Sequence, residues 1–151
     1  MEIRTARRAD IPRLVEFNQA MAFETEGKRL DQEVLTSGVS AVFEDVAKGF
    51  YVVAEENGEI VGGLLVTFEW SDWRNGWFWW IQSVYIVQEF RGKKIYSEMY
   101  DFVKNKAYET GGVWGFRLYV EKENDHAQRV YEKLGMTETY YLMYEEKGKS
   151  R

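Results

Sequence analysis

A chain of 151 residues with 45% hydrophobic content can bury one sizeable core, which predicts a single domain over residues 1–147 and a charged tail at 148–151. The absence of cysteine and the single histidine, His126, exclude disulfides, thiolate metal sites, a cysteine nucleophile and paired imidazoles, so we expect no metal ion. The net charge of −5 argues against nucleic-acid binding, and the lack of an apolar stretch of about 20 residues predicts a cytoplasmic protein without a membrane partner.

Hydrophobic periodicity and turn residues predict elements in the order β-α-α-β-β-β-α-β-α-β. In chain order they are a strand at 2–6, a helix that begins at Asp10, a helix from Asp31 to near Gly49, strands at 50–55, 59–70 and 77–87, a helix at 92–109, a strand at 113–120, a helix at 125–134 and a last strand at 137–144. Asp10 is expected to cap the first helix, Asn57-Gly58 to turn the first hairpin and Gly135 to end the last helix. Residues 24–30 break the helical period and are predicted to form a loop.

A basic turn joins the strand at 77–87 to the helix at 92–109, and it places Arg91, Lys93 and Lys94 at the positive end of that helix. Each cation there costs about 0.3 to 1 kcal/mol unless an anion binds. Backbone N–H groups converge on one point where a strand, a glycine-containing turn and a helix meet, which suits a phosphate group. The pattern therefore predicts a phosphorylated ligand at this turn. The alternative is a solvated loop with incidental lysines.

Two segments resemble the motifs of the Gcn5-related N-acetyltransferase (GNAT) superfamily. One is V-Q-E-F-R-G-K-K-I-Y at 87–96, where Lys94 and Tyr96 stand at positions that are usually glycine or alanine; the other is Asn124-x-x-Ala127-x-x-x-Tyr131-x-x-x-Gly135-Met136. Together with the element order, the resemblance implies the GNAT fold, which is α/β (α+β by some schemes). We expect one mixed, mostly antiparallel central sheet of about six strands, flanked by four helices.

The resemblance implies an N-acetyltransferase that uses acetyl-CoA as co-substrate and transfers the acetyl group to a primary amine of a small molecule or peptide by direct attack. The pantetheine arm would pair with the strand that contains Val84, and a backbone N–H of Val84 or Tyr85 would polarise the thioester carbonyl. The implied cofactor-binding residues are Val84, Tyr85, Ile86, Arg91, Gly92, Lys93, Lys94, Ile95, Tyr96, Ser97, Asn124, Ala127 and Tyr131. Asn124 is also a good helix N-cap, and both roles are compatible.

The catalytic candidates are Tyr131, Glu121 and Glu26. If the family geometry applies, the Tyr131 hydroxyl lies next to the sulfur and protonates the leaving thiolate; the alternative is a core aromatic, because Tyr131 shares a helical face with Leu134. The resemblance implies a catalytic glutamate on the central strand or the next one, and the corresponding positions here are expected to be Gln82 and Tyr119, neither an effective base. Any of Glu24, Glu26 and Glu121 could instead take the proton through water, or each could be an ordinary solvated carboxylate.

The acceptor site is expected to involve Glu24, Glu26, Gln82 and Trp79, because aromatic rings and carboxylates suit a cationic amine. Five of the six tryptophans lie within residues 70–80, and a homodimer contact would explain them equally well. Three functions therefore remain open: an N-acetyltransferase, a non-catalytic acyl-CoA-binding or sensor module of the same fold, and a single-stranded nucleic-acid binder that stacks bases on the tryptophans. The acidic charge counts against the third.

Overall fold

A computed structural model describes residues 1–149, and the chain divides into two compact units, Met1–Tyr119 and Val120–Arg151. The first unit contains β1 Glu2–Thr5, α1 Ile11–Glu26, α2 Gln32–Glu44, β2 Phe50–Glu56, β3 Glu59–Ser71, β4 Gly76–Ile86, α3 Ile95–Thr110 and β5 Val113–Arg117, with short 3₁₀ turns at Arg8–Asp10 and Gln88–Phe90. The second unit contains α4, Asp125–Lys133. The single domain at 1–147 stays a prediction, and the last two residues of the predicted tail, 150 and 151, lie outside the described residues.

The five strands form one mixed sheet in the order β1-β2-β3-β4-β5. Neighbouring strands are antiparallel except β4 and β5, which are parallel. The predicted fold class is confirmed, with five strands in place of about six. No strand forms at 137–144 in the described part of the chain, where Tyr140, Leu142 and Tyr144 are exposed. The residues at 137–144 therefore have an apolar sequence typical of a strand but do not pair with the sheet.

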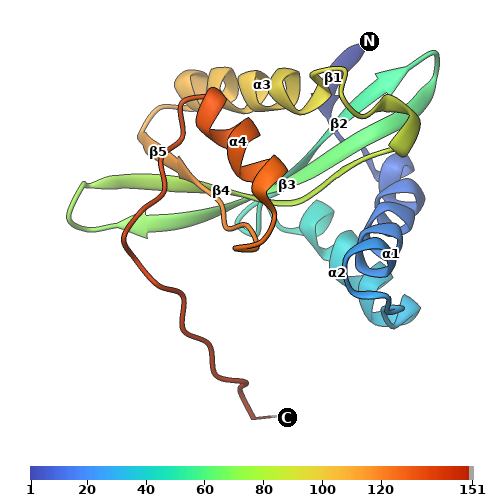
Figure 1. Ribbon diagram of the computed structural model, residues 1–151, viewed down its shortest axis with the longest axis horizontal. Helices are drawn as coiled ribbons and strands as arrows, with labels where there is room; N and C mark the ends of the chain where they lie inside the picture. The colour runs from blue at the N-terminus through green and yellow to red at the C-terminus, as the bar shows by residue number, and fades with distance from the viewer. Residues whose placement is uncertain (150–151) are drawn as a thin grey trace. The chain divides into compact units, whose positions relative to one another are not determined.

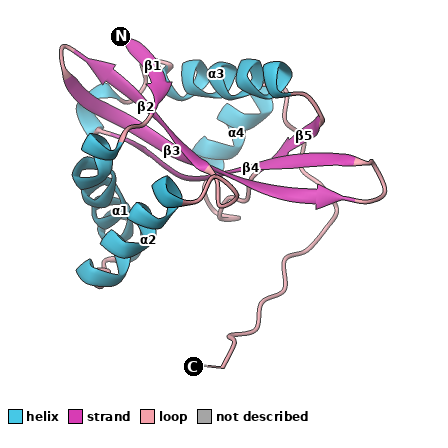
Figure 2. Ribbon diagram, turned by 180° about the vertical axis from the view of Figure 1, so that it is seen from behind, coloured by secondary structure: helices cyan, strands magenta, loops and turns pink. Residues whose placement is uncertain are grey.

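Helices cover both faces of the sheet in the first unit, with α3 on one face and α1 and α2 on the other (Figures 1 and 2). Side chains of a strand alternate between faces, so Tyr51 and Val53 of β2 join Leu14, Phe17 and Val39 in the core beneath α1 and α2. The other face is covered by the buried stripe of α3, which consists of Ile95, Met99, Tyr100, Val103 and Ala107. None of the helices in residues 1–149 is long and apolar enough to cross a membrane.

Several predicted boundaries are wrong, and the largest error is at the end of α1. The helix continues through Glu26 and ends at Gly27, which has a left-handed φ of 63° and donates to the carbonyl of Phe23. Residues 24–26 are therefore helical, where a loop was predicted. The reason is that polar residues with fair helix propensity can extend a helix beyond its buried stripe without breaking its hydrogen bonds. The helix α2 also ends earlier than predicted, at Glu44, and β5 ends at Arg117.

Candidate functional site

A β-bulge interrupts the β3–β4 ladder near the end of β4. Two residues of β4, Ser83 and Val84, lie opposite the single residue Leu64 of β3, and Ser83 has a φ of 52°. A positive φ is uncommon for a residue with a side chain, and bulges of this kind re-aim backbone groups and often lie next to functional sites. The bulge therefore changes the direction of the strand just before Tyr85 and Ile86.

The strands β4 and β5 pair over only part of their length. The pairing begins at Trp77 with Val113 and ends at Trp80 with Arg117. From Ile81 to Ile86, the edge of β4 on the β5 side has no strand partner among residues 1–149. An exposed strand edge can pair with an extended ligand that carries amides.

The basic turn follows directly from this edge and leads into α3. Its backbone is tightly curved, because Gly92 has a φ of 77° and Lys94 a φ of 65°. The first hydrogen bond of the helix runs from the Glu98 amide to the Lys94 carbonyl, 3.1 Å apart. The amides of Ile95 and Ser97 belong to the first turn of the helix, and amides there have no acceptor within the helix. Helix geometry therefore directs donors toward the space in front of α3, as a phosphate site requires.

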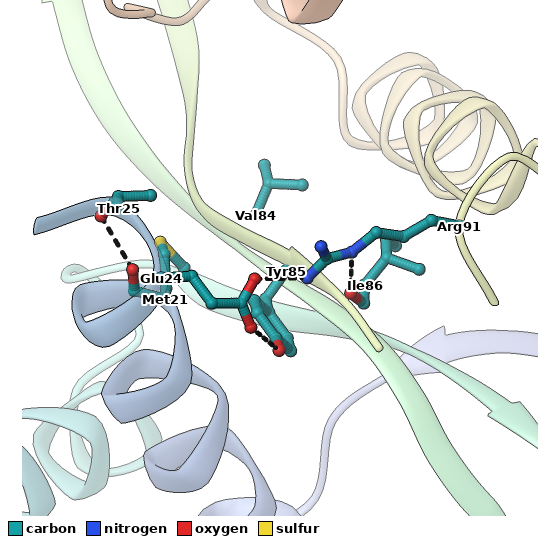
Figure 3. Close-up of a pocket in the computed structure, with 7 residues that line it drawn as sticks. All are labelled: Met21, Glu24, Thr25, Val84, Tyr85, Ile86 and Arg91. Atoms are coloured by element: carbon teal, nitrogen blue, oxygen red, sulfur yellow. Dashed lines mark hydrogen bonds and ion pairs between the residues drawn. The ribbon is translucent and has the colours of Figure 1, made fainter. Parts of the chain in front are cut away.

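A pocket of about 270 Å³ lies between α1, the end of β4 and the start of the basic turn. It is lined by Met21, Glu24, Thr25, Val84, Tyr85, Ile86 and Arg91 (Figure 3). Three of these residues come from the last turns of α1, three come from the bulge on β4 or the residues after it, and Arg91 comes from the turn. The walls are mostly apolar, and the charged groups are one carboxylate and one guanidinium.

Glu24 is the centre of a hydrogen-bond network in this pocket. One carboxylate oxygen accepts from the Tyr85 hydroxyl at 2.5 Å, and the other forms an ion pair with Arg91 Nη2 at 2.8 Å. Arg91 Nε also donates to the Ile86 carbonyl at 2.8 Å, and its guanidinium lies over the Tyr85 ring. The hydrogen bonds from Tyr85 and Arg91 lower the pKa of Glu24. Burial and the bond to Glu24 raise the pKa of Tyr85, so the phenol stays protonated at neutral pH.

Among the residues predicted from sequence, the structure brings Val84, Tyr85, Ile86, Arg91 and Glu24 together in one pocket. Sequence reasoning missed Met21 and Thr25, because a loop was predicted at 24–30 whereas α1 carries Thr25 one turn after Met21. Helical spacing was the available signal, since residues at i, i+3 and i+4 share one face of a helix. Sequence reasoning also did not identify Glu24 as the anionic partner of Arg91. The carboxylate of Glu24 offsets part of the positive charge at the turn.

Three predicted acceptor residues do not line the pocket. Glu26 is exposed and pairs with Lys28 at 3.4 Å, and Gln82 Nε2 donates to the Thr67 hydroxyl at 2.6 Å. Trp79 is only 4% exposed and packs against the rings of Phe50 and Phe68, which favours a core role. Their roles in acceptor binding stay predictions.

The neighbouring tryptophans of β4 divide between the two faces of the sheet, because side chains of a strand alternate. Trp77 is 41% exposed and forms an edge-to-face pair with Trp70, which is 49% exposed, near the tip of the β3–β4 hairpin. On the other face, Trp80 Nε1 donates to the carboxylate of Glu69. The exposed pair therefore lies apart from the pocket residues along β4.

The second unit holds the remaining predicted residues, and its local structure can be described by itself. Asn124 caps α4 by accepting from the Ala127 amide at 3.1 Å, and Gly135 ends the helix with a φ of 96°, both as predicted. Burial raises the pKa of the Tyr131 phenol. Glu121 lies in the loop before α4, because β5 ends at Arg117.

Comparison with known proteins agrees with this geometry. A model of the acetyltransferase (GNAT) family matches residues 11–136. The chain is similar to the structure of a possible acetyltransferase from Clostridium difficile 630, with 46% identity, a TM-score of 0.90, and coverage of 99% of this chain and 98% of that chain. A comparison with curated proteins found no match.

Two more distant structures share the fold. A predicted acetyltransferase from Clostridium acetobutylicum, with acetyl-CoA, is 23% identical, with a TM-score of 0.79 and coverage of 96% of this chain and 95% of that chain. The glucosamine-6-phosphate N-acetyltransferase from Arabidopsis thaliana is 22% identical, with a TM-score of 0.73 and coverage of 96% of this chain and 97% of that chain. At these identities the similarity shows the fold alone.

Proposed function

This chain belongs to the acetyltransferase (GNAT) family, and we propose that it transfers an acetyl group from acetyl-CoA to a primary amine of a small molecule or peptide. One observation carries the proposal. The unpaired edge of β4 at Ile81–Ile86 runs directly into the basic turn and the amino end of α3. A strand edge followed by a cradle of amides and cations matches a ligand that has an amide-bearing arm joined to a diphosphate.

The residues fit coenzyme A in two places. The edge of β4 around Val84 would pair with the pantetheine amides, since the bulge turns backbone groups out of the β3 ladder there. Arg91, Lys93 and the first amides of α3 would hold the diphosphate, because charge-assisted hydrogen bonds to phosphate are stronger than neutral ones. Bound acetyl-CoA supplies an activated acetyl group as a thioester.

The residues of this chain would then orient the reactants and move protons. An alkylammonium ion is deprotonated in only about one molecule in 2,500 at pH 7, so the acceptor must lose a proton, and Glu26 and Glu121 are the predicted routes through water. The amide of Val84 or Tyr85 would polarise the thioester carbonyl. Tyr131 would give a proton to the departing sulfur, and its raised pKa keeps that proton on the phenol at neutral pH.

The acceptor is proposed to bind in the pocket beside β4. Glu24 offers a carboxylate to a cationic amine, and Met21, Val84 and Ile86 offer apolar contacts to its carbon chain. A lowered pKa makes Glu24 a poor general base but a stable counter-ion for an ammonium group.

The test is release of free thiol from acetyl-CoA in the presence of a panel of polyamines, amino acids and peptides. An acetyltransferase releases thiol in proportion to one class of amine and yields the acetylated product by mass spectrometry. Binding of coenzyme A with no thiol release for any amine would instead support the second candidate, a non-catalytic acyl-CoA-binding module. That candidate is favoured by the resemblance, under which Gln82 and Tyr119 stand where the family's catalytic glutamate is expected.

A further inference from the structure

Arg91 binds the carboxylate of Glu24 and the backbone carbonyl of Ile86, and the proposed reaction uses both groups to bind its substrates. Its Nη2 pairs with Glu24, and its Nε donates to the Ile86 carbonyl at 2.8 Å (Figure 3). The first group is the carboxylate of the acceptor pocket. The second lies on the strand edge where the pantetheine arm would pair. One guanidinium thus bridges the acceptor pocket and the cofactor edge.

The ion pair is weak enough to exchange. The side chains of Arg91 and Glu24 are 43% and 40% exposed, and exposed ion pairs contribute little because water screens them. A diphosphate offers Arg91 a higher charge and two oxygens in the planar geometry that a guanidinium prefers. Arg91 belongs to the turn that leads into α3, on the same segment as the amides that would hold the diphosphate.

Glu24 retains a partner when Arg91 leaves. Its second oxygen still accepts from the Tyr85 hydroxyl, which holds the carboxylate in place at the pocket wall. The pocket then presents one uncompensated negative charge among the apolar side chains of Met21, Val84 and Ile86. Such a site fits an ammonium group that carries a short apolar arm.

We propose that Arg91 exchanges Glu24 and the Ile86 carbonyl for the cofactor's diphosphate, and that this exchange exposes Glu24 as the binding carboxylate for a cationic acceptor. The inference rests on the proposed function. Its consequence is positive coupling: the cofactor raises the affinity for the amine, and by thermodynamic reciprocity the amine raises the affinity for the cofactor. Acceptors without a cation gain nothing from the exchange, so the device also selects for amines.

The test compares three proteins by titration calorimetry with coenzyme A. Glu24→Gln removes the competitor for Arg91 and is expected to bind coenzyme A about fivefold more tightly than the wild type, at the lower end of typical coupling between sites. The matched control is Glu16→Gln on the same helix, where Glu16 pairs with Arg13 at 2.8 Å and Arg13 lies over the ring of Phe17. The control is expected to bind coenzyme A as the wild type does.

A second arm uses n-butylammonium as the probe, with binding followed by NMR line broadening. Wild-type protein is expected to bind the probe about fivefold more tightly with saturating coenzyme A than without it, and Glu24→Gln to lose that gain. Equal affinity of the wild type and Glu24→Gln for coenzyme A, or no gain in probe binding, would overturn the exchange while leaving the proposed function intact. Failure of all three proteins to bind coenzyme A would instead refute the proposed function.

Discussion

Asp10 is a buried carboxylate whose partners differ from those predicted. Instead of capping α1 with its side chain, it accepts two hydrogen bonds from the Arg4 guanidinium, at 2.8 and 3.2 Å, and one from the Arg7 amide at 2.8 Å. Burial alone would raise the pKa of Asp10, but the bonds from Arg4 and Arg7 outweigh it and the pKa is lowered. Arg4 also binds Glu55 of β2, so the network ties β1 to both its neighbour strand and the start of α1.

Replacing Asp10 by Asn is expected to lower the free energy of unfolding at pH 7 by about 2 kcal/mol, because charged hydrogen bonds to Arg4 are lost. The folded pKa of Asp10 lies below its unfolded value of 3.8, so its contribution is complete above that value and is lost as the pH falls through the folded pKa. The stabilities of the wild type and Asp10→Asn should therefore converge in acid. Urea unfolding at pH 7 and at a series of lower pH values measures this.

The exposed residue Asp101, which pairs with Lys104 at 3.5 Å, supplies the control. Asp101→Asn should change stability little at any of these pH values. A constant difference between wild type and Asp10→Asn across the acid range would contradict the assignment of a lowered pKa.

Tyr131 is the residue on which the proposed proton transfer depends. Tyr131→Phe keeps the ring and removes the hydroxyl, so turnover is expected to fall by one to a few orders of magnitude with coenzyme A affinity nearly unchanged. Steady-state kinetics and calorimetry on the same preparation measure both quantities. Tyr108→Phe, at a tyrosine that is 90% exposed on α3, is the matched control. Equal turnover in the wild type and Tyr131→Phe would remove Tyr131 from the mechanism.

At the scale of elements, the turn before α3 contains a lysine in a backbone conformation that glycine usually adopts. Lys94 adopts a φ of 65°, a left-handed conformation that glycine reaches without strain and other residues reach at a cost of roughly 1–2 kcal/mol. The family motif usually has glycine or alanine at this position. In this chain a lysine therefore occupies a left-handed position that favours glycine.

Lys94→Gly is expected to raise the free energy of unfolding by about 0.5–1 kcal/mol, because relief of the left-handed strain exceeds the entropy cost of glycine. Lys93→Gly removes the same charge from the adjacent residue, which has no positive φ, so it gains no relief of strain and should be about 1–2 kcal/mol less stable than Lys94→Gly. Thermal and urea unfolding of the two variants measure this difference. Equal effects in both variants would show that charge, and not backbone conformation, dominates this turn.

The elements differ in how far sequence could predict them. The Asn57-Gly58 hairpin and the cap at Asn124 depend on one or two residues with strong local preferences, and both form as predicted. The bulge at Ser83 could not be predicted, because serine has no preference for a positive φ and only the pairing with β3 imposes it. The ends of α1 and β5 also depended on partners elsewhere in the chain, which periodicity does not describe.

For the whole molecule, ligand binding should appear as a change in stability. Coenzyme A at about 100 times its dissociation constant is expected to add about 2.7 kcal/mol to the free energy of unfolding, which corresponds to an increase in melting temperature of roughly 5–10 °C for a chain of this size. The increase should shrink at high salt and in a variant with Arg91 and Lys93 both replaced by Ala. Thermal shift assays measure it.

Pantetheine, which lacks the diphosphate, is the control ligand and should produce a smaller shift at the same concentration. An equal shift for pantetheine and coenzyme A would contradict the assignment of the basic turn to the diphosphate. No shift with coenzyme A under any condition would contradict cofactor binding itself.

The sequence by itself determined the family and the order of the elements up to α4. The family follows from the resemblance of two motifs, and the element order follows from local chemistry: periodicity of 2 or 3.6 residues and turn residues with special backbone angles. Only the tertiary structure decided that Glu24 faces Arg91 across a pocket and that Asp10 binds Arg4. It also decided that β4 is bulged where its edge becomes free. Each of these features brings together segments that are distant in the chain. Packing of the sheet against α1 decides how such segments meet, and the local preferences of the segments do not.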